Sequence, residues 1–203
     1  MTISEVKFFL RDRNSELADA WARYFKGIED VEVSCGDIFD LQADAVVSPA
    51  NSFGFMDGGI DLVYSHYFGW ELQERLRELL RKEHDGELPV GQAVIVETCH
   101  ERIPYLISAP TMRVPMFVAN TVNAYLAFRA TIRVVAEHNK RSNKPIRTVL
   151  CCGLGTATGG ISPDVCAKQM LAAYLICAKD YLNSPTDLHD AVAEHGRLTR
   201  VDK

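Results

Sequence analysis

Hydrophobic and polar positions along the chain repeat with two different periods. Short apolar runs, most of them bounded by glycine or proline, predict strands. They cover residues 6–10, 31–35, 45–47, 93–97, 106–109 and 148–152. Between them, apolar residues recur every three or four positions, as in helices that bury one face. Strands that alternate with long helices predict an α/β fold with a largely parallel sheet covered on both faces.

The helical segments share this repeat of three and four residues and have recognisable ends. They run from Asn14 to Gly27, from Ile60 to near His84, from Val118 to Val135, and from Ser162 and Pro163 to Cys177. The second segment reads as one long amphipathic helix. The last begins with proline, which is favoured at the first helical position.

The folded part of the chain is expected to end near Leu182. Residues 1–182 have the length and pattern of one domain, and 203 residues in all are enough for a stable core. Asn183, Ser184 and Pro185 then break the last helix. Residues 183–203 are therefore predicted to be a polar C-terminal tail with no more regular structure than a loose helical turn.

The charge and hydropathy of the chain argue against two classes of partner, nucleic acids and membranes. The 22 basic and 27 acidic residues give a net charge of −5, which argues against nucleic acid as a partner. No window approaches the ~20 apolar residues that a membrane span needs, and the first residues lack a signal-peptide core. We therefore expect a cytoplasmic protein without a membrane partner.

The six cysteines point to no metal or cofactor. None stands in a C-x-x-C pair, and Cys151 and Cys152 are neighbours inside an apolar run. Cysteines of this kind are typical of small buried hydrophobes in a reducing compartment rather than of zinc ligands or disulfides.

Candidate chemistry lies in two glycine-rich loops that each follow a predicted strand. In residues 48–61, SPANSFGFMDGGID, Gly58 and Gly59 stand at the start of a helix, where free N–H groups favour an anion. In residues 152–162, CGLGTATGGIS, successive N–H groups can wrap a phosphate, with Thr156 and Thr158 as further donors. One such loop alone is also a common tight connection. Two of them suit a diphosphate held between two backbone cradles.

These stretches, taken together, match a family pattern. The segments that match are Gly36-Asp37-Ile38, Asp44-Ala45-Val46-Val47, Pro49-Ala50-Asn51-Ser52, Gly58-Gly59-Ile60-Asp61 and the glycine-rich run from Gly153 to Gly160. Over residues of about 31 to 180 the chain resembles the macro domain family. The resemblance implies a three-layer α/β/α sandwich with a mixed, mostly parallel central sheet. It also implies a crevice that binds ADP-ribose or an ADP-ribosylated substrate.

The resemblance assigns roles to individual residues. Asp37 would accept the exocyclic amine of adenine, with the backbone at Ile38 completing the base contact; the alternative is an aspartate that caps its own turn. Asn51 would bind the distal ribose, or only structure its loop. Asp61 would position a water near the anomeric carbon; the alternative is an acid that only interacts favourably with the helix dipole in the first turn. The remaining ligand-binding candidates are Gly58, Gly59, Ile60, Gly153, Gly155, Thr156, Ala157, Thr158 and Gly159.

The sequence departs from the family pattern at several positions. Ser48 replaces the first asparagine of the N-A-A-N segment, and Asp57 stands where glycine is common. Ala157 and Thr158 leave the second loop without the aromatic residue that the family often places beside the ribose. Stacking on the ribose is then either lost or supplied by Phe53 or Phe55, and the alternative for these two rings is packing beneath their own loop. Arg113, between two prolines, is a candidate to pair with a phosphate or a partner carboxylate, and the favoured alternative is a surface arginine with no role.

The expected function is binding of ADP-ribosyl groups, together with hydrolysis of ADP-ribose from a protein or a small molecule, with Asn51 and Asp61 as catalytic residues. A non-catalytic reader of ADP-ribose is the first alternative, favoured by the altered loops. A phosphatase acting on ADP-ribose 1″-phosphate and an assembly module are the others. A shared fold does not by itself decide among these.

Overall fold

The computed structural model describes residues 5–178 and 185–200. Six strands form one sheet: β1 (Lys7–Asp12), β2 (Val31–Cys35), β3 (Ala45–Ser48), β4 (Val94–Glu97), β5 (Tyr105–Ser108) and β6 (Thr148–Cys151). Their order is β2-β1-β6-β3-β5-β4. All neighbours are parallel except β4 and β5. The predicted mixed, mostly parallel sheet is confirmed, and each strand lies within two residues of its predicted position.

The register aligns the carboxyl ends of the strands at one edge. Leu10 pairs with Cys151 across β1 and β6, and Ser48 pairs with Ser108 across β3 and β5. In parallel sheets of this kind, ligands bind beyond that edge, in the loops that follow the strands. The fold therefore brings the loops after β1, β3, β5 and β6 together.

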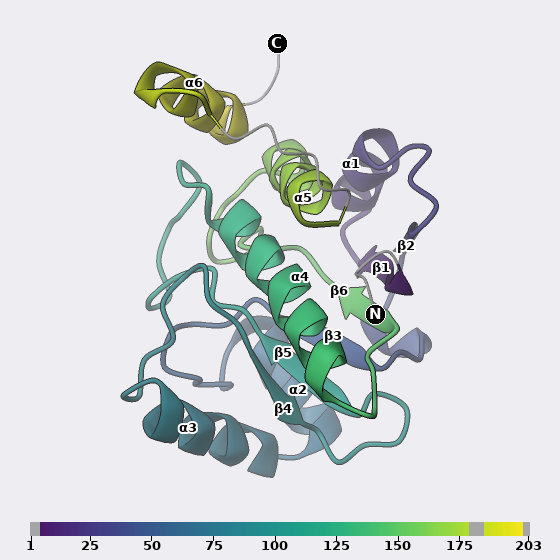
Figure 1. The fold of residues 1–203 in the computed structure, drawn as a ribbon. Coiled ribbons are helices and arrows are strands. Elements are labelled where there is room, and N and C mark those ends of the chain that lie inside the picture. The colour runs from purple at the N-terminus through teal and green to yellow at the C-terminus, as the bar shows by residue number, and fades with distance from the viewer. Residues whose placement is uncertain (1–4, 179–184, 201–203) are drawn as a thin grey trace.

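Helices cover both faces of the sheet, which confirms the three-layer architecture (Figure 1). On one face lie α1 (Ser15–Tyr24), α4 (Asn123–Arg141) and α5 (Pro163–Ala178); on the other lie α2 (Gly59–Phe68) and α3 (Glu71–Glu83). Alternate strand residues feed two cores, because successive side chains point to opposite faces. Phe8 packs beneath the first set of helices, whereas Val46 and Leu150 pack beneath the second.

The prediction of one long helix from Ile60 to His84 is wrong. The chain breaks at Gly69, whose φ of 92° is rarely available to other residues and ends α2. Leu72 and Leu76 of α3 continue the apolar stripe because both helices pack on the same face of the sheet. Periodicity alone therefore could not reveal the break. Likewise, α4 begins at Asn123 rather than at Val118. Val118 is buried because its side chain packs against Gly159 of the second glycine-rich loop.

The C-terminal segment is more ordered than predicted. Residues Leu188–Thr199 form a helix, α6, with Asp187 capping its start. The far end of α6 packs on α5, where Gln169 Nε2 donates to Leu198 O at 3.0 Å. The expectation of no more than a loose turn is wrong. The aspartate caps the start of the helix, and a buried apolar residue at position 198 stabilises its far end. The predicted boundary at residue 182 lies outside the described residues.

Burial divides the cysteines into groups. Cys151, Cys152 and Cys166 are buried and Cys177 is partly buried, whereas Cys35 and Cys99 are exposed. The expectation of buried hydrophobes therefore holds fully for three of the six. Across residues 5–178 and 185–200, no helix combines the length and the apolar character that crossing a membrane requires.

Candidate functional site

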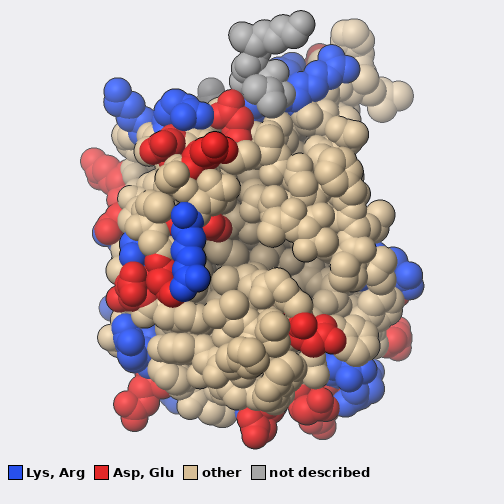
Figure 2. Space-filling model, turned by 180° about the vertical axis from the view of Figure 1, so that it is seen from behind, with Lys and Arg blue, Asp and Glu red and all other residues tan. Residues whose placement is uncertain are grey.

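Three loops meet at the carboxyl edge of the sheet: residues 49–58 after β3, 109–122 after β5 and 152–162 after β6. Asn51 forms a β-bridge with Met112, and Val118 N donates to Gly159 O at 2.8 Å. Seen from behind, the molecule is hollowed near its centre, and its charged side chains gather mainly around the margin (Figure 2).

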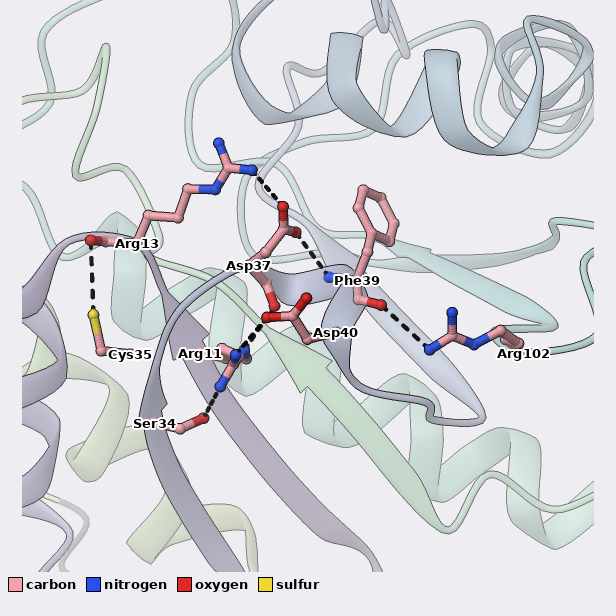
Figure 3. Close-up of polar contacts among 8 residues, drawn as sticks. All are labelled: Arg11, Arg13, Ser34, Cys35, Asp37, Phe39, Asp40 and Arg102. Atoms are coloured by element: carbon pink, nitrogen blue, oxygen red, sulfur yellow. Dashed lines mark hydrogen bonds and ion pairs between the residues drawn. The ribbon is translucent and has the colours of Figure 1, made fainter.

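Asp37 lies two residues after the end of β2 and caps a short 3₁₀ helix, Ile38–Asp40. Its Oδ1 accepts from Phe39 N at 3.0 Å, and its Oδ2 pairs with the Arg13 guanidinium (Figure 3). The backbone hydrogen bond from Phe39 and, after it, the pairing with Arg13 hold the pKa of Asp37 below its usual value. The carboxylate therefore caps its own turn, and its contact with adenine stays a prediction.

Arg11 lies beneath Asp37 and links three segments. Its Nε donates to Asp37 O at 2.6 Å, while its Nη atoms reach Ser34 Oγ at 2.9 Å and Asp40 Oδ2 at 2.8 Å (Figure 3). A Cβ atom on Gly36 would lie 2.3 Å from the guanidinium, and Gly36 has a φ of 145°. Only glycine at position 36 thus allows Arg11 to hold this turn in place.

A cavity of about 110 Å³ opens beside this network. Its lining is Arg11, Asp12, Arg13, Gly36, Asp37, Ile38, Ile60, Val63 and Cys152. Apolar side chains face charged ones, an arrangement that suits a planar group with a polar edge. The cavity brings together three predicted residues, Asp37, Ile38 and Ile60. A larger hollow of about 770 Å³ lies between β4 and the end of α4, away from both glycine-rich loops.

Gly58 and Gly59 form the exposed start of α2. Gly58 is the N-cap and makes no side-chain capping bond, so the first N–H groups of the helix are left for another acceptor. A Cβ atom on either glycine would meet no atom within 4 Å. Gly59 has a φ of 57°, which explains a glycine there, but Gly58 has an ordinary extended φ of −147°. No contact among the described residues therefore requires position 58 to lack a side chain.

The second loop is shaped by packing. Gly153 N donates to Asp12 Oδ2 at 2.9 Å, and Ile161 N donates to Gly155 O at 3.0 Å. A Cβ atom on Gly159 would lie 2.4 Å from Gly155 O. These glycines are needed for close backbone contact. Of the other predicted ligand contacts in this loop, Ala157 and Thr158 are exposed, and Thr156 is half-buried with its hydroxyl beside Gly153.

Asn51 holds the first loop together. Its Nδ2 donates to Phe55 O at 2.7 Å, and its Oδ1 accepts from Phe53 N at 3.0 Å and from Phe55 N at 3.3 Å. Both ends of the amide are therefore engaged within the loop. This is the loop-structuring role, and binding of a ribose by Asn51 stays a prediction.

Asp61 lies in the first turn of α2 and is only 6% exposed. Its Oδ1 accepts from the Ser48 hydroxyl at 2.5 Å, so the residue that replaces the family's asparagine contacts the candidate catalytic acid. Burial raises the pKa of Asp61 to about 7, although the hydrogen bond from Ser48 opposes the rise. The carboxyl group can consequently take up or release a proton near neutral pH.

Phe53, Phe55 and Arg113 brace the first loop. Arg113 forms a two-point ion pair with Glu87, at 2.7 and 3.0 Å, and lies 4.9 Å from the centre of the Phe53 ring. Arg77 lies 4.4 Å from the centre of the Phe55 ring. Arg113 thus pairs with a carboxylate rather than standing as a surface arginine with no role, and a guanidinium lies over each of the two phenylalanine rings.

Several residues of the crevice were not predicted. The sequence R-D-R at residues 11–13 follows the predicted strand 6–10 and carries charge, and attention to the residues that come after each predicted strand could have found it. Phe117 and Val118 gave no such signal, because Val118 stands at the start of a predicted helical stripe and Phe117 directly precedes it. Only the folded chain places them beside Gly159 and Gly160.

A family model described as macro domain matches residues 47–170. An uncharacterized protein of Aquifex aeolicus is 31% identical over 142 residues, which cover 70% of this chain and 79% of that protein. Among solved structures, the macrodomain of Mycobacterium tuberculosis DarG has a TM-score of 0.59 at 21% identity, over 71% of this chain and 90% of that one. A variant of the Oceanobacillus iheyensis macrodomain with ADP-ribose has a TM-score of 0.58 at 20% identity, over 70% and 74%.

Proposed function

The chain belongs to the macro domain family, and on this premise we propose that it binds ADP-ribose or an ADP-ribosyl group in the crevice at the carboxyl edge of its sheet. A relative of the same fold, from Oceanobacillus iheyensis, has been solved with ADP-ribose. In this chain the base would occupy the cavity beside Asp37, and the diphosphate would lie between Gly58 and the second loop.

The observation that carries the proposal is Gly58. This residue has neither a strained backbone nor a neighbour that a side chain would strike, yet it caps a helix whose first N–H groups have no side-chain acceptor. A glycine in that position leaves room for a phosphate to take the place of the missing cap. Unlike Gly58, the crowded glycines of the crevice lack a side chain because of contacts within the chain.

The test is a pair of substitutions at Gly58 that differ only in charge. Aspartate and asparagine are both strong N-cap residues, so Gly58→Asp and Gly58→Asn should fold at least as stably as the wild type. Only aspartate adds a negative charge where the diphosphate would lie. Isothermal titration with ADP-ribose should show weaker binding in both, and at least about tenfold weaker binding in Gly58→Asp than in Gly58→Asn.

A matched control is Gly196→Ala, within α6, where a Cβ atom also meets nothing within 4 Å. It should leave ADP-ribose binding unchanged. Wild-type affinity in the Gly58→Asp protein would overturn the proposal, because a carboxylate cannot share a site with a diphosphate at no cost.

Hydrolysis of the ADP-ribosyl bond is a second candidate, favoured by Asp61. Its pKa of about 7 suits a general base at neutral pH. In this mechanism the oxygen of a water forms a bond to the anomeric carbon while the bond to the acceptor breaks. Asp61 takes a proton from the water, and the leaving group gains one.

The test for hydrolysis is release of free ADP-ribose from a modified protein by the wild type and by Asp61→Asn. The two side chains have the same size, so the comparison isolates the ionisable group. Release that requires Asp61 supports a hydrolase. Equal release by both proteins removes Asp61 from the reaction, and binding without any release leaves a reader.

A further inference from the structure

Phe117 stands out among the aromatic residues because it is exposed at the edge of the crevice. It is 69% exposed, compared with 47% for Trp70 and 42% for Phe55. A Cβ atom on Gly160 would lie 2.2 Å from the Phe117 ring, so part of the ring rests directly on the backbone of the second loop. The rest of the ring is left open to solvent.

The position of Phe117 is fixed by its neighbour. Val118 is 3% exposed, and its side chain lies beneath the second loop, 2.7 Å from where a Cβ atom on Gly159 would stand. Val118 N donates to Gly159 O at 2.8 Å, and Val118 O accepts from the Thr121 hydroxyl at 2.7 Å. The loop after β5 is therefore fastened to the loop after β6, and an exposed ring at this point is held rather than free to collapse.

The order of the strands places Phe117 opposite the Asp37 cavity. That cavity lies at the ends of β1 and β2, whereas Phe117 follows β5, on the other side of β6. If the base occupies the cavity and the diphosphate lies at Gly58, as proposed above, the part of the ligand beyond the diphosphate extends toward β5. Asn51, bridged to Met112, approaches the same end of the crevice from the first loop.

Resting on the proposed function, we propose that Phe117 is a specificity-determining residue that forms an aromatic wall for the sugar beyond the diphosphate. The C–H groups of a sugar face pack on the face of an aromatic ring and exclude water there. The wall makes the crevice prefer ADP-ribose to ADP, because ADP ends at the diphosphate and does not reach Phe117.

The two phenylalanines that the sequence offered for this role are engaged elsewhere. The guanidinium of Arg113 lies over Phe53, and that of Arg77 lies over Phe55. No cation lies over the ring of Phe117 anywhere in the described part of the chain. Its exposed surface is available to a ligand.

The test is isothermal titration of the full chain with ADP-ribose and, separately, with ADP. Phe117→Ala should weaken ADP-ribose binding about three- to tenfold and leave ADP binding unchanged, since only the longer ligand reaches the ring. Phe117→Tyr keeps the ring and should retain the wild-type preference. Trp70→Ala is the matched control: it removes another exposed ring, which lies just beyond the end of α2 that is far from Gly58.

The outcomes separate this inference from the proposed function. A wild-type protein that binds neither ligand contradicts the proposed function itself. Wild-type binding of both ligands, with equal weakening or no weakening in Phe117→Ala, overturns only the role of Phe117. Urea unfolding of each variant checks that the exposed substitution leaves the fold intact.

Discussion

The hydroxyl of Ser48 donates to Asp61 Oδ1 across 2.5 Å and joins the last residue of β3 to the first turn of α2. This hydrogen bond stabilises the charged form of the acid, whereas burial opposes that form. Burial prevails, since the pKa of Asp61 rises from 3.8 to about 7. The protonation of Asp61, and with it the stability of the fold, therefore depends on pH near neutrality.

Between pH 4 and 7, the folded chain binds a proton at Asp61 that the unfolded chain has lost, so this group lowers the free energy of unfolding as pH rises. The loss is complete above pH 7. Asp61→Asn should raise the free energy of unfolding on the order of a few kcal/mol at pH 8 and change it little at pH 4. Urea unfolding at the two pH values measures this, and the same difference at both would refute it.

Asn51 can be tested by separating what it accepts from what it donates. Asn51→Ala removes three hydrogen bonds and should lower the free energy of unfolding by about 1–3 kcal/mol. Asn51→Asp keeps the two accepted bonds but places a carboxylate beside Phe55 O. Asn51→Asp should lower the affinity for ADP-ribose if the Asn51 amide binds the ribose. An Asn51→Ala protein as stable as the wild type would show that the loop does not depend on this side chain.

Gly36→Ala should disturb the Asp37 turn. The methyl group would collide with the Arg11 guanidinium, and the backbone φ of 145° strains any other residue. We expect a loss of about 1–3 kcal/mol in the free energy of unfolding, together with weaker ADP-ribose binding. Gly196→Ala serves as the control, because it adds the same methyl group to a helix with open space and should be neutral or slightly stabilising. Equal stabilities of the two variants would contradict the expectation.

Gln169 is fully buried and connects three helices. Its Oε1 accepts from Tyr125 N at 3.1 Å, and its Nε2 donates to Thr121 O at 2.8 Å and to Leu198 O at 3.0 Å. Gln169→Glu has the same shape but loses both donated bonds and adds a carboxylate. It should lower the free energy of unfolding by about 2–4 kcal/mol, more at pH 8 than at pH 4. A pH-independent effect would show that water reaches the side chain.

The sequence predicted well what depends on neighbouring residues. The Asn14 cap, the Pro163 helix start and the strand positions follow from local chemistry, and the structure has each of them. The break at Gly69 could not be predicted, because the apolar stripe continues on both sides of it. Nor could the contacts of Arg11 with Asp37 or of Phe117 with Gly160, since these pairs are distant along the chain and meet only in the finished fold.

Asp12, the last residue of β1, also accepts from Gly153 N at the start of the second loop, although the two residues lie 141 positions apart. The glycine-rich loop thus receives its shape from a strand at the opposite end of the chain. The region that matches the family, residues 47–170, contains neither this aspartate nor the Arg11–Asp37 turn. A fragment limited to that region would keep Asn51, Asp61 and the second glycine-rich loop, yet lack Asp37 and the contact from Asp12 that holds this loop.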